Sequence, residues 1–194
     1  MEKVQRIKSR VIPLPIKDVD TDMIIPAQYL TSISASGYGA NLFRRLRDQD
    51  PAFPFNKPEY ARASILVADD NFGCGSSREH AVWALLDAGI RAVICKSFAD
   101  IFFNNSLKNG LLPIKLPHAA VDNILARSLT ENYVLCVDLE AQEVACPDRP
   151  ALKFDFDPFR KHCLLNGLDD VQYIQSYAAQ LAEYRRESAL PWNP

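Results

Sequence analysis

The order of elements between residues 65 and 95 constrains the fold of this chain more than any other feature. Four apolar residues at 65–68 predict a buried strand, and Gly73 and Gly75 predict a turn after it. Helical spacing of apolar residues then predicts a helix over 76–86, and a second apolar run predicts a strand at 92–95. A strand, helix and strand within about 30 residues form a βαβ unit, so we expect the two strands to be parallel.

The rest of the chain extends this unit into one α/β domain over residues 1–194 with a mixed parallel and antiparallel sheet. The signals after residue 130 are typical of antiparallel strands, and a helical appendage is expected at 157–194. Residues 11–16 and 23–25 are expected to form two strands, or a strand and a buried extended segment. Further strands are expected at 111–116, 133–137, 143–144 and 152–156, and further helices at 99–109, 117–129, 158–166 and 168–186.

Composition excludes several classes of function. A chain of 194 residues with 48% hydrophobic and 24% charged residues forms an ordinary globular core. Its net charge of -2 provides no electrostatic footprint for nucleic acid. No apolar run approaches the roughly 18 residues that span a bilayer, and no signal peptide is recognisable, so we expect a cytoplasmic protein without a membrane partner.

Cysteine and histidine spacing argues against a metal site on this chain. The five cysteines are widely separated and form neither a zinc-like nor a cluster-like pattern. The three histidines form no H-x-x-x-H pair. We therefore expect no metal or cofactor to be bound by this chain alone.

Residues 69–80 concentrate the chemistry of the sequence. A glycine turn before a helix exposes unpaired N–H groups and favours an anion. The dinucleotide motif G-x-G-x-x-G fails because Arg78 stands at its third glycine, and the P-loop and the nucleophile elbow G-x-S-x-G fail as well. Ser76 and Glu79 match a capping box, so plain helix capping remains an alternative to a ligand site.

Arg78 is the second unusual residue of this turn. A cation in the first turn of a helix opposes the positive end of the helix dipole. Either Asp69, Asp70 or Glu79 compensates its charge locally, or its guanidinium faces outward and binds a carboxylate through two hydrogen bonds.

Three segments carry a family resemblance. Residues 69–81 (DDNFGCGSSREHA) closely resemble a motif of the swivelling domain of the aconitase superfamily. Residues 18–26 (DVDTDMIIP) and 97–113 resemble two further motifs, in the same order as in that family. Within it, a free-standing chain of this length with a Gly-Tyr-Gly loop resembles the small subunits of 3-isopropylmalate dehydratases most.

The resemblance implies a single swivelling-type domain with a barrel-like mixed sheet flanked by helices. It also implies a hydro-lyase of leucine biosynthesis that interconverts 2-isopropylmalate and 3-isopropylmalate through 2-isopropylmaleate. The partner would be a large subunit that carries a [4Fe–4S] cluster, and the substrate would be a small dicarboxylate. Small subunits of related hydro-lyases, such as homoaconitase or citraconate and methylmalate hydratases, remain alternatives. A non-enzymatic anion- or nucleotide-binding module and a stand-alone serine hydrolase are further alternatives.

The resemblance also assigns residues to the site. Ser76 would be the base that removes a proton next to a carboxylate, and Arg78 would assist catalysis and bind substrate. Residues 31–58 would form a flexible loop that selects the side group of the substrate. The remaining substrate-binding residues would be Ser77, Asp22, Thr21, Gly75 and Tyr38.

Overall fold

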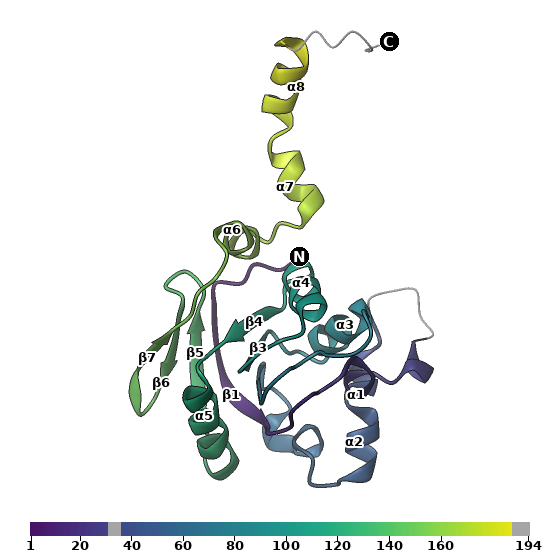
Figure 1. The fold of residues 1–194 in the computed structure, drawn as a ribbon, viewed down its shortest axis with the longest axis vertical. Coiled ribbons are helices and arrows are strands. Elements are labelled where there is room, and N and C mark those ends of the chain that lie inside the picture. The colour runs from purple at the N-terminus through teal and green to yellow at the C-terminus, as the bar shows by residue number, and fades with distance from the viewer. Residues whose placement is uncertain (31–35, 188–194) are drawn as a thin grey trace.

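The computed structural model describes residues 1–30 and 36–187, and its centre is a seven-stranded mixed sheet with the order β4-β3-β2-β1-β5-β6-β7 (Figure 1). Neighbours among β1 to β4 pair in parallel, whereas β5 pairs antiparallel with β1 and continues through β6 to β7. The end strands β4 and β7 do not pair with each other, so the half-barrel that the sheet forms stays open. The expected α/β fold with a mixed sheet is confirmed.

The βαβ unit is confirmed as well. It consists of β2 (Ile65–Ala68), α3 (Glu79–Asp87) and β3 (Ala92–Cys95). The other strands are β1 (Arg6–Leu14), β4 (Leu112–Lys115), β5 (Val134–Asp138), β6 (Glu143–Cys146) and β7 (Arg149–Lys153). The other helices are α1 (Thr21–Ile24), α2 (Arg44–Gln49), α4 (Asp100–Asn109), α5 (His118–Thr130), α6 (Pro158–Asn166), α7 (Asp170–Ser176) and α8 (Ala178–Glu187).

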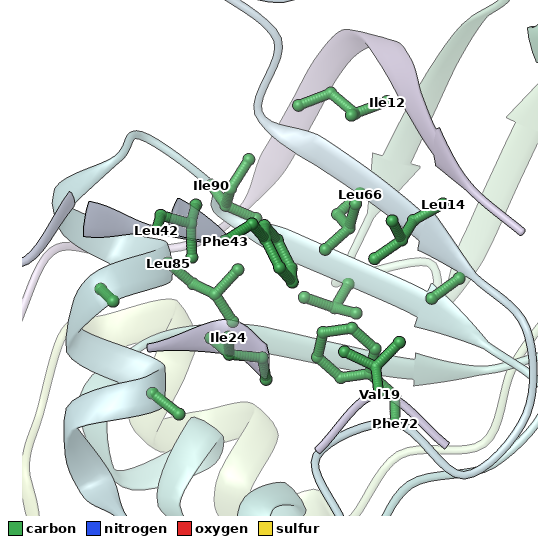
Figure 2. Close-up of a cluster of buried hydrophobic side chains, with 14 of the residues drawn as sticks. Ile12, Leu14, Val19, Ile24, Leu42, Phe43, Leu66, Phe72, Leu85 and Ile90 are labelled. Carbon is green, nitrogen blue, oxygen red and sulfur yellow. The ribbon is translucent and has the colours of Figure 1, made fainter. Parts of the chain in front are cut away.

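Both faces of the parallel strands are buried, each against a different layer. Alternate strand residues such as Ile12 and Leu66 join a cluster that includes Ile24 of α1 and Leu85 of α3 (Figure 2). Their chain neighbours, such as Ile65, join a second cluster with residues of α5 and β5. Parallel strands covered on both faces have continuous apolar runs, which explains why the signal at 65–68 was clear.

Several predicted elements differ from the structure. The strand expected at 11–16 is β1 at Arg6–Leu14, and the strand expected at 152–156 is β7 at Arg149–Lys153. The apolar residues 23–25, expected as a strand or a buried extended segment, belong largely to the short helix α1, which the Asp20 side chain caps by accepting a hydrogen bond from Met23 N at 2.6 Å. The helix expected from residue 76 begins at Glu79. The helix expected at 168–186 is interrupted at Tyr177 between α7 and α8.

Helices α7 and α8 extend away from the body of the domain (Figure 1). Their apolar side chains are exposed, among them Val171, Ile174 and Leu181. In the described part of the chain, none of the helices combines the length and the apolar composition needed to cross a membrane.

Candidate active site

Two segments that are about 50 residues apart in the chain run side by side at the site. The backbone N–H of Gly73 donates to the Val19 carbonyl at 2.7 Å, and the N–H of Thr21 donates to the Cys74 carbonyl at 3.0 Å. These contacts lock residues 18–22 against the glycine turn, so the D-T-D and G-S-S-R motifs form one surface.

Thr21 reaches further along the turn through its side chain. Its hydroxyl donates a hydrogen bond to the backbone carbonyl of Ser76 at 3.0 Å, and the Thr21 side chain is buried. Gly75, one residue earlier, has a φ of +86°, a conformation that a side chain strains, and a Cβ there would stand 3.4 Å from the Asp20 Cβ. Thr21 and Gly75 therefore determine where the Ser76 backbone lies; neither presents a polar side chain to solvent.

Ser76 and Ser77 are both exposed at the tip of the turn. Neither hydroxyl makes a hydrogen bond with another group in the described residues. Both hydroxyls are thus available to a ligand that approaches from solvent.

Arg78 follows the two serines and is held by an acidic residue from the other segment. Its Nη1 donates to Asp22 Oδ1 at 2.9 Å, and the Arg78 side chain is 24% exposed. The hydrogen bond from Arg78, followed by one from the Ala27 backbone N–H, holds the pKa of Asp22 below its usual range. Asp22 therefore stays ionised and orients the guanidinium, whose Nη2 and Nε have no partner among the described residues.

These contacts correct two expectations about the turn. Arg78 is the N-cap residue of α3 and Ser76 lies before the helix, so the capping-box alternative is wrong. Asp22 is the acid that pairs with Arg78, in place of the three candidates close to it in sequence. Glu79, one of those candidates, instead accepts a hydrogen bond from Asn109 Nδ2 at 2.6 Å.

The other two candidates, Asp69 and Asp70, bind residues that follow strand β3 and so hold the start of the turn in place. Asp70 accepts a short hydrogen bond from the Ser97 hydroxyl, which holds the pKa of Asp70 below its usual range. Asp69 pairs with Lys96 at 2.7 Å, and Lys96, whose side chain is only 8% exposed, also pairs with Asp122 at 2.6 Å. Sequence reasoning missed Lys96 and Asp122, and it did not connect Ser97 of the third motif to the turn, because no local spacing links these residues to it.

The segment expected as a flexible loop is structured over residues 36–58. It contains the 3-10 turns Gly39–Asn41 and Pro54–Asn56 and helix α2, and it buries aromatic rings, including that of Phe43, in the core. Residues 31–35, the first part of the predicted loop, lie outside the described residues. The role of the segment in selecting substrates stays a prediction.

Tyr38 lies in this structured segment and not at the surface of the site. Its side chain is 2% exposed, and its ring packs on His80 at a centroid distance of 5.4 Å and against Trp83 at 6.3 Å. The structure thus makes Tyr38 a packing residue between the segment and α3, and it leaves the expected substrate contact without support. Asp87 adds an anchor that the sequence did not signal, because its Oδ2 accepts hydrogen bonds from two glycine N–H groups of residues 37–39, at 3.0 and 2.7 Å.

Metal-binding groups are scattered through the described residues. No three His, Cys, Asp or Glu side chains of that part of the chain gather where they could hold a metal ion. All five cysteines are unpaired, and burial raises the pKa of the Cys74 thiol, which makes it a poor nucleophile or ligand. The described residues therefore do not fit an iron–sulfur cluster.

The surface as a whole combines two open hydroxyls with an oriented guanidinium. The free Nη2 and Nε groups of a guanidinium suit a carboxylate, and a neighbouring hydroxyl can add a third hydrogen bond. The surface is therefore suited to bind a carboxylate.

The chain is similar in sequence and in structure to proteins of one family. The aconitase C-terminal domain family matches residues 1–119. Over 200 residues, small subunits of 3-isopropylmalate dehydratase from Parvibaculum lavamentivorans and from a Ruegeria species are 52% and 50% identical to this chain, and each match covers 99% of this chain and 100% of the relative. A crystal structure of 3-isopropylmalate dehydratase from Methanocaldococcus jannaschii has a TM-score of 0.69 and 30% identity, and covers 92% of this chain and 99% of that chain.

Proposed function

The chain belongs to the family of 3-isopropylmalate dehydratase small subunits, which carry an aconitase C-terminal domain, and from this premise we propose that it forms half of the active site of a hydro-lyase. The reaction is the interconversion of 2-isopropylmalate and 3-isopropylmalate by loss and return of water. The observation that carries the proposal is the exposed pair Ser76 and Ser77 beside an Arg78 guanidinium that Asp22 orients.

In this proposal Arg78 and Ser77 bind one carboxylate of the substrate. The free Nη2 and Nε of Arg78 donate two parallel hydrogen bonds, which fixes the plane of the carboxylate. The Ser77 hydroxyl donates another. The carbon next to that carboxylate is thereby brought to the Ser76 hydroxyl.

Ser76 acts as the base in the dehydration. Its deprotonated oxygen takes the proton from that carbon, the C–H electron pair forms the C=C bond, and the hydroxyl group of the adjacent carbon leaves with its bonding pair as hydroxide. In the return step Ser76 gives that proton to the carbon that lost the hydroxyl, while hydroxide adds to the other carbon. A serine base needs a lowered pKa, which the positive charge of Arg78 favours.

The partner in this proposal is the large subunit of the same enzyme. The chain itself brings a base and a carboxylate clamp, and its described residues provide no set of metal ligands. We therefore assign the [4Fe–4S] cluster, which supplies Lewis acid chemistry at the leaving hydroxyl, to the large subunit. A cytoplasmic location is part of the proposal and is supported by five unpaired cysteines.

The test is turnover by the assembled pair with Ser76→Ala. We expect turnover of 2-isopropylmalate to fall by about a thousandfold or more, since removal of a general base costs about 10²–10⁴. Gel filtration and the absorbance of the cluster check that assembly is intact. Ser77→Ala is the matched control at an equally exposed serine, and it should raise KM more than it lowers kcat.

Near-normal turnover by Ser76→Ala would contradict the assignment. The same wild-type pair, assayed with 2-isopropylmalate, homocitrate and citraconate, separates this function from related hydro-lyases. Preference for either of the last two substrates would replace isopropylmalate in the proposal.

A further inference from the structure

Asp22 contacts two guanidinium groups, one with each of its oxygens. Oδ1 accepts from Arg78 Nη1 at 2.9 Å, and Oδ2 lies 3.7 Å from Arg45 Nη1. Arg45 comes from α2, far from the glycine turn in sequence, and its side chain is 52% exposed. The motifs that identify the site do not include it.

Asp22 and Arg45 both line an open cleft of about 440 Å³. The cleft therefore opens Asp22 to solvent on the side of α2, whereas Arg78 does not line it. Its lining includes Asp22, Tyr29, Arg44, Arg45, Asp48 and Gln49.

The charges of this cluster do not cancel. Asp22 alone would neutralise Arg78, and a neutralised guanidinium attracts a substrate carboxylate weakly. With Arg45 on the second oxygen, one carboxylate is shared between two cations, so these three side chains together carry one net positive charge.

We propose that Arg45 is a positioning residue, which shares Asp22 with Arg78 and so keeps the Arg78 guanidinium available to the substrate carboxylate. This inference rests on the proposed function. Arg45 acts through Asp22 and does not touch the substrate.

Arg44 provides a matched control on the same helix. It lines the same cleft and is similarly exposed, at 45%, but its Nε donates to Asp48 at 2.9 Å, one turn further along α2. Arg44→Gln removes the same charge from α2 without changing the contacts of Asp22.

The experiment compares KM and kcat of the assembled pair for Arg45→Gln, Arg45→Lys and Arg44→Gln. Because ion pairs between exposed groups couple weakly, we expect Arg45→Gln to raise KM by about threefold with little change in kcat. Arg45→Lys, which keeps the charge, should restore the wild-type KM, and Arg44→Gln should leave KM unchanged. An equal increase in KM for both glutamine variants, or none for Arg45→Gln, would overturn the proposal.

An Asp22→Asn background tests the route of the effect. If Arg45 acts through Asp22, Arg45→Gln should raise KM in the wild-type background and not in the Asp22→Asn background. The same increase in both backgrounds would mean that Arg45 binds the substrate directly, which overturns the positioning role.

A measurement on the isolated chain separates this inference from the proposed function. In an NMR titration, Arg45→Gln should raise the pKa of Asp22, whereas Arg44→Gln should leave it unchanged. If the wild-type pair fails to turn over isopropylmalate, the proposed function fails while this result still stands. An unchanged Asp22 pKa in Arg45→Gln would overturn the inference whatever the turnover.

Discussion

The hydrogen bond from Thr21 to the Ser76 carbonyl is the contact through which a buried residue most directly controls the proposed base. Thr21→Val removes the donor and keeps the shape of the side chain. A net hydrogen bond contributes about 0.5–1.5 kcal/mol. Thr21 is buried and Ser76 is exposed, so this hydrogen bond lies at the boundary of the core, and we expect its loss to fall within that range. We therefore expect a destabilisation of about 1 kcal/mol, which lowers Tm by about 2–4 °C in a chain of this size.

The effect on turnover should exceed the effect on stability. Loss of the hydrogen bond releases the backbone that places the Ser76 oxygen, and a displacement of about 1 Å can cost up to a hundredfold in rate. We expect kcat of the assembled Thr21→Val enzyme to fall by about tenfold, with KM nearly unchanged because Arg78 is not displaced.

Two control variants separate positioning from stability. Thr21→Ser keeps the hydroxyl and should keep most of kcat. Thr130→Val removes a threonine hydroxyl that bonds the Arg127 carbonyl at 3.2 Å in α5, far from the turn in sequence, and should leave kcat unchanged. Differential scanning calorimetry and steady-state kinetics provide the two readouts. A Thr21→Val enzyme with lowered Tm and wild-type kcat would refute the positioning argument.

The remaining predictions concern the turn and its acid. Gly73→Ala would place a Cβ 2.2 Å from the Phe102 Cγ at a φ of +80°, so we expect a loss of about 3 kcal/mol in urea unfolding, and a loss below about 0.5 kcal/mol would contradict the crowding. Because the pKa of Asp22 is lowered in the folded state, its stabilising contribution is full above the ordinary carboxyl pKa of about 3.9 and is lost as pH falls through the lowered value. The difference in unfolding free energy between wild type and Asp22→Asn should therefore be constant from about pH 5 to 8 and shrink below about pH 4; a difference that grows on acidification would reverse the sign.

The elements that the sequence predicts well are those whose signal is local. The apolar runs at 65–68 and 92–95 and the helix between them are recognisable because burial on both faces leaves no polar residue in either strand. The prediction of extended structure at residues 23–25 is wrong because three apolar residues suit a strand or a helical turn equally. The Asp20 side chain, which caps the helical turn, lies outside this apolar run.

The segment 36–58 shows a second reason why prediction from the sequence is limited. Its glycine and proline content predicts irregular structure, whereas its backbone consists of short 3-10 helices, the short helix α2 and the irregular residues between them. Its order comes from tertiary burial of Tyr38, Phe43 and Phe53, which composition does not reveal. The same holds for Asp87, whose role depends on which backbone N–H groups the fold brings to it.

In the candidate site, too, the sequence reveals the local motifs but not the contacts between distant segments. The glycine turn and the D-T-D segment were identified separately as motifs, but the Asp22–Arg78 pair required knowing that the two segments are adjacent. From the sequence alone, the acidic residues close to Arg78 in the chain were the candidate partners of its guanidinium. Those neighbours have partners of their own, such as Lys96 for Asp69, and they support the turn.

The hydrogen bonding around Ser76 bears on when this serine becomes a base. In the described residues the fold fixes the Ser76 carbonyl through Thr21, yet donates no hydrogen bond to the Ser76 hydroxyl. In the free chain the positive charge of Arg78 is therefore the one feature of the proposed function that favours the basic form of Ser76. Full activation requires further hydrogen-bond donors to the Ser76 oxygen. In the proposed function these come with assembly, when the large subunit and a bound carboxylate close over the turn and exclude water.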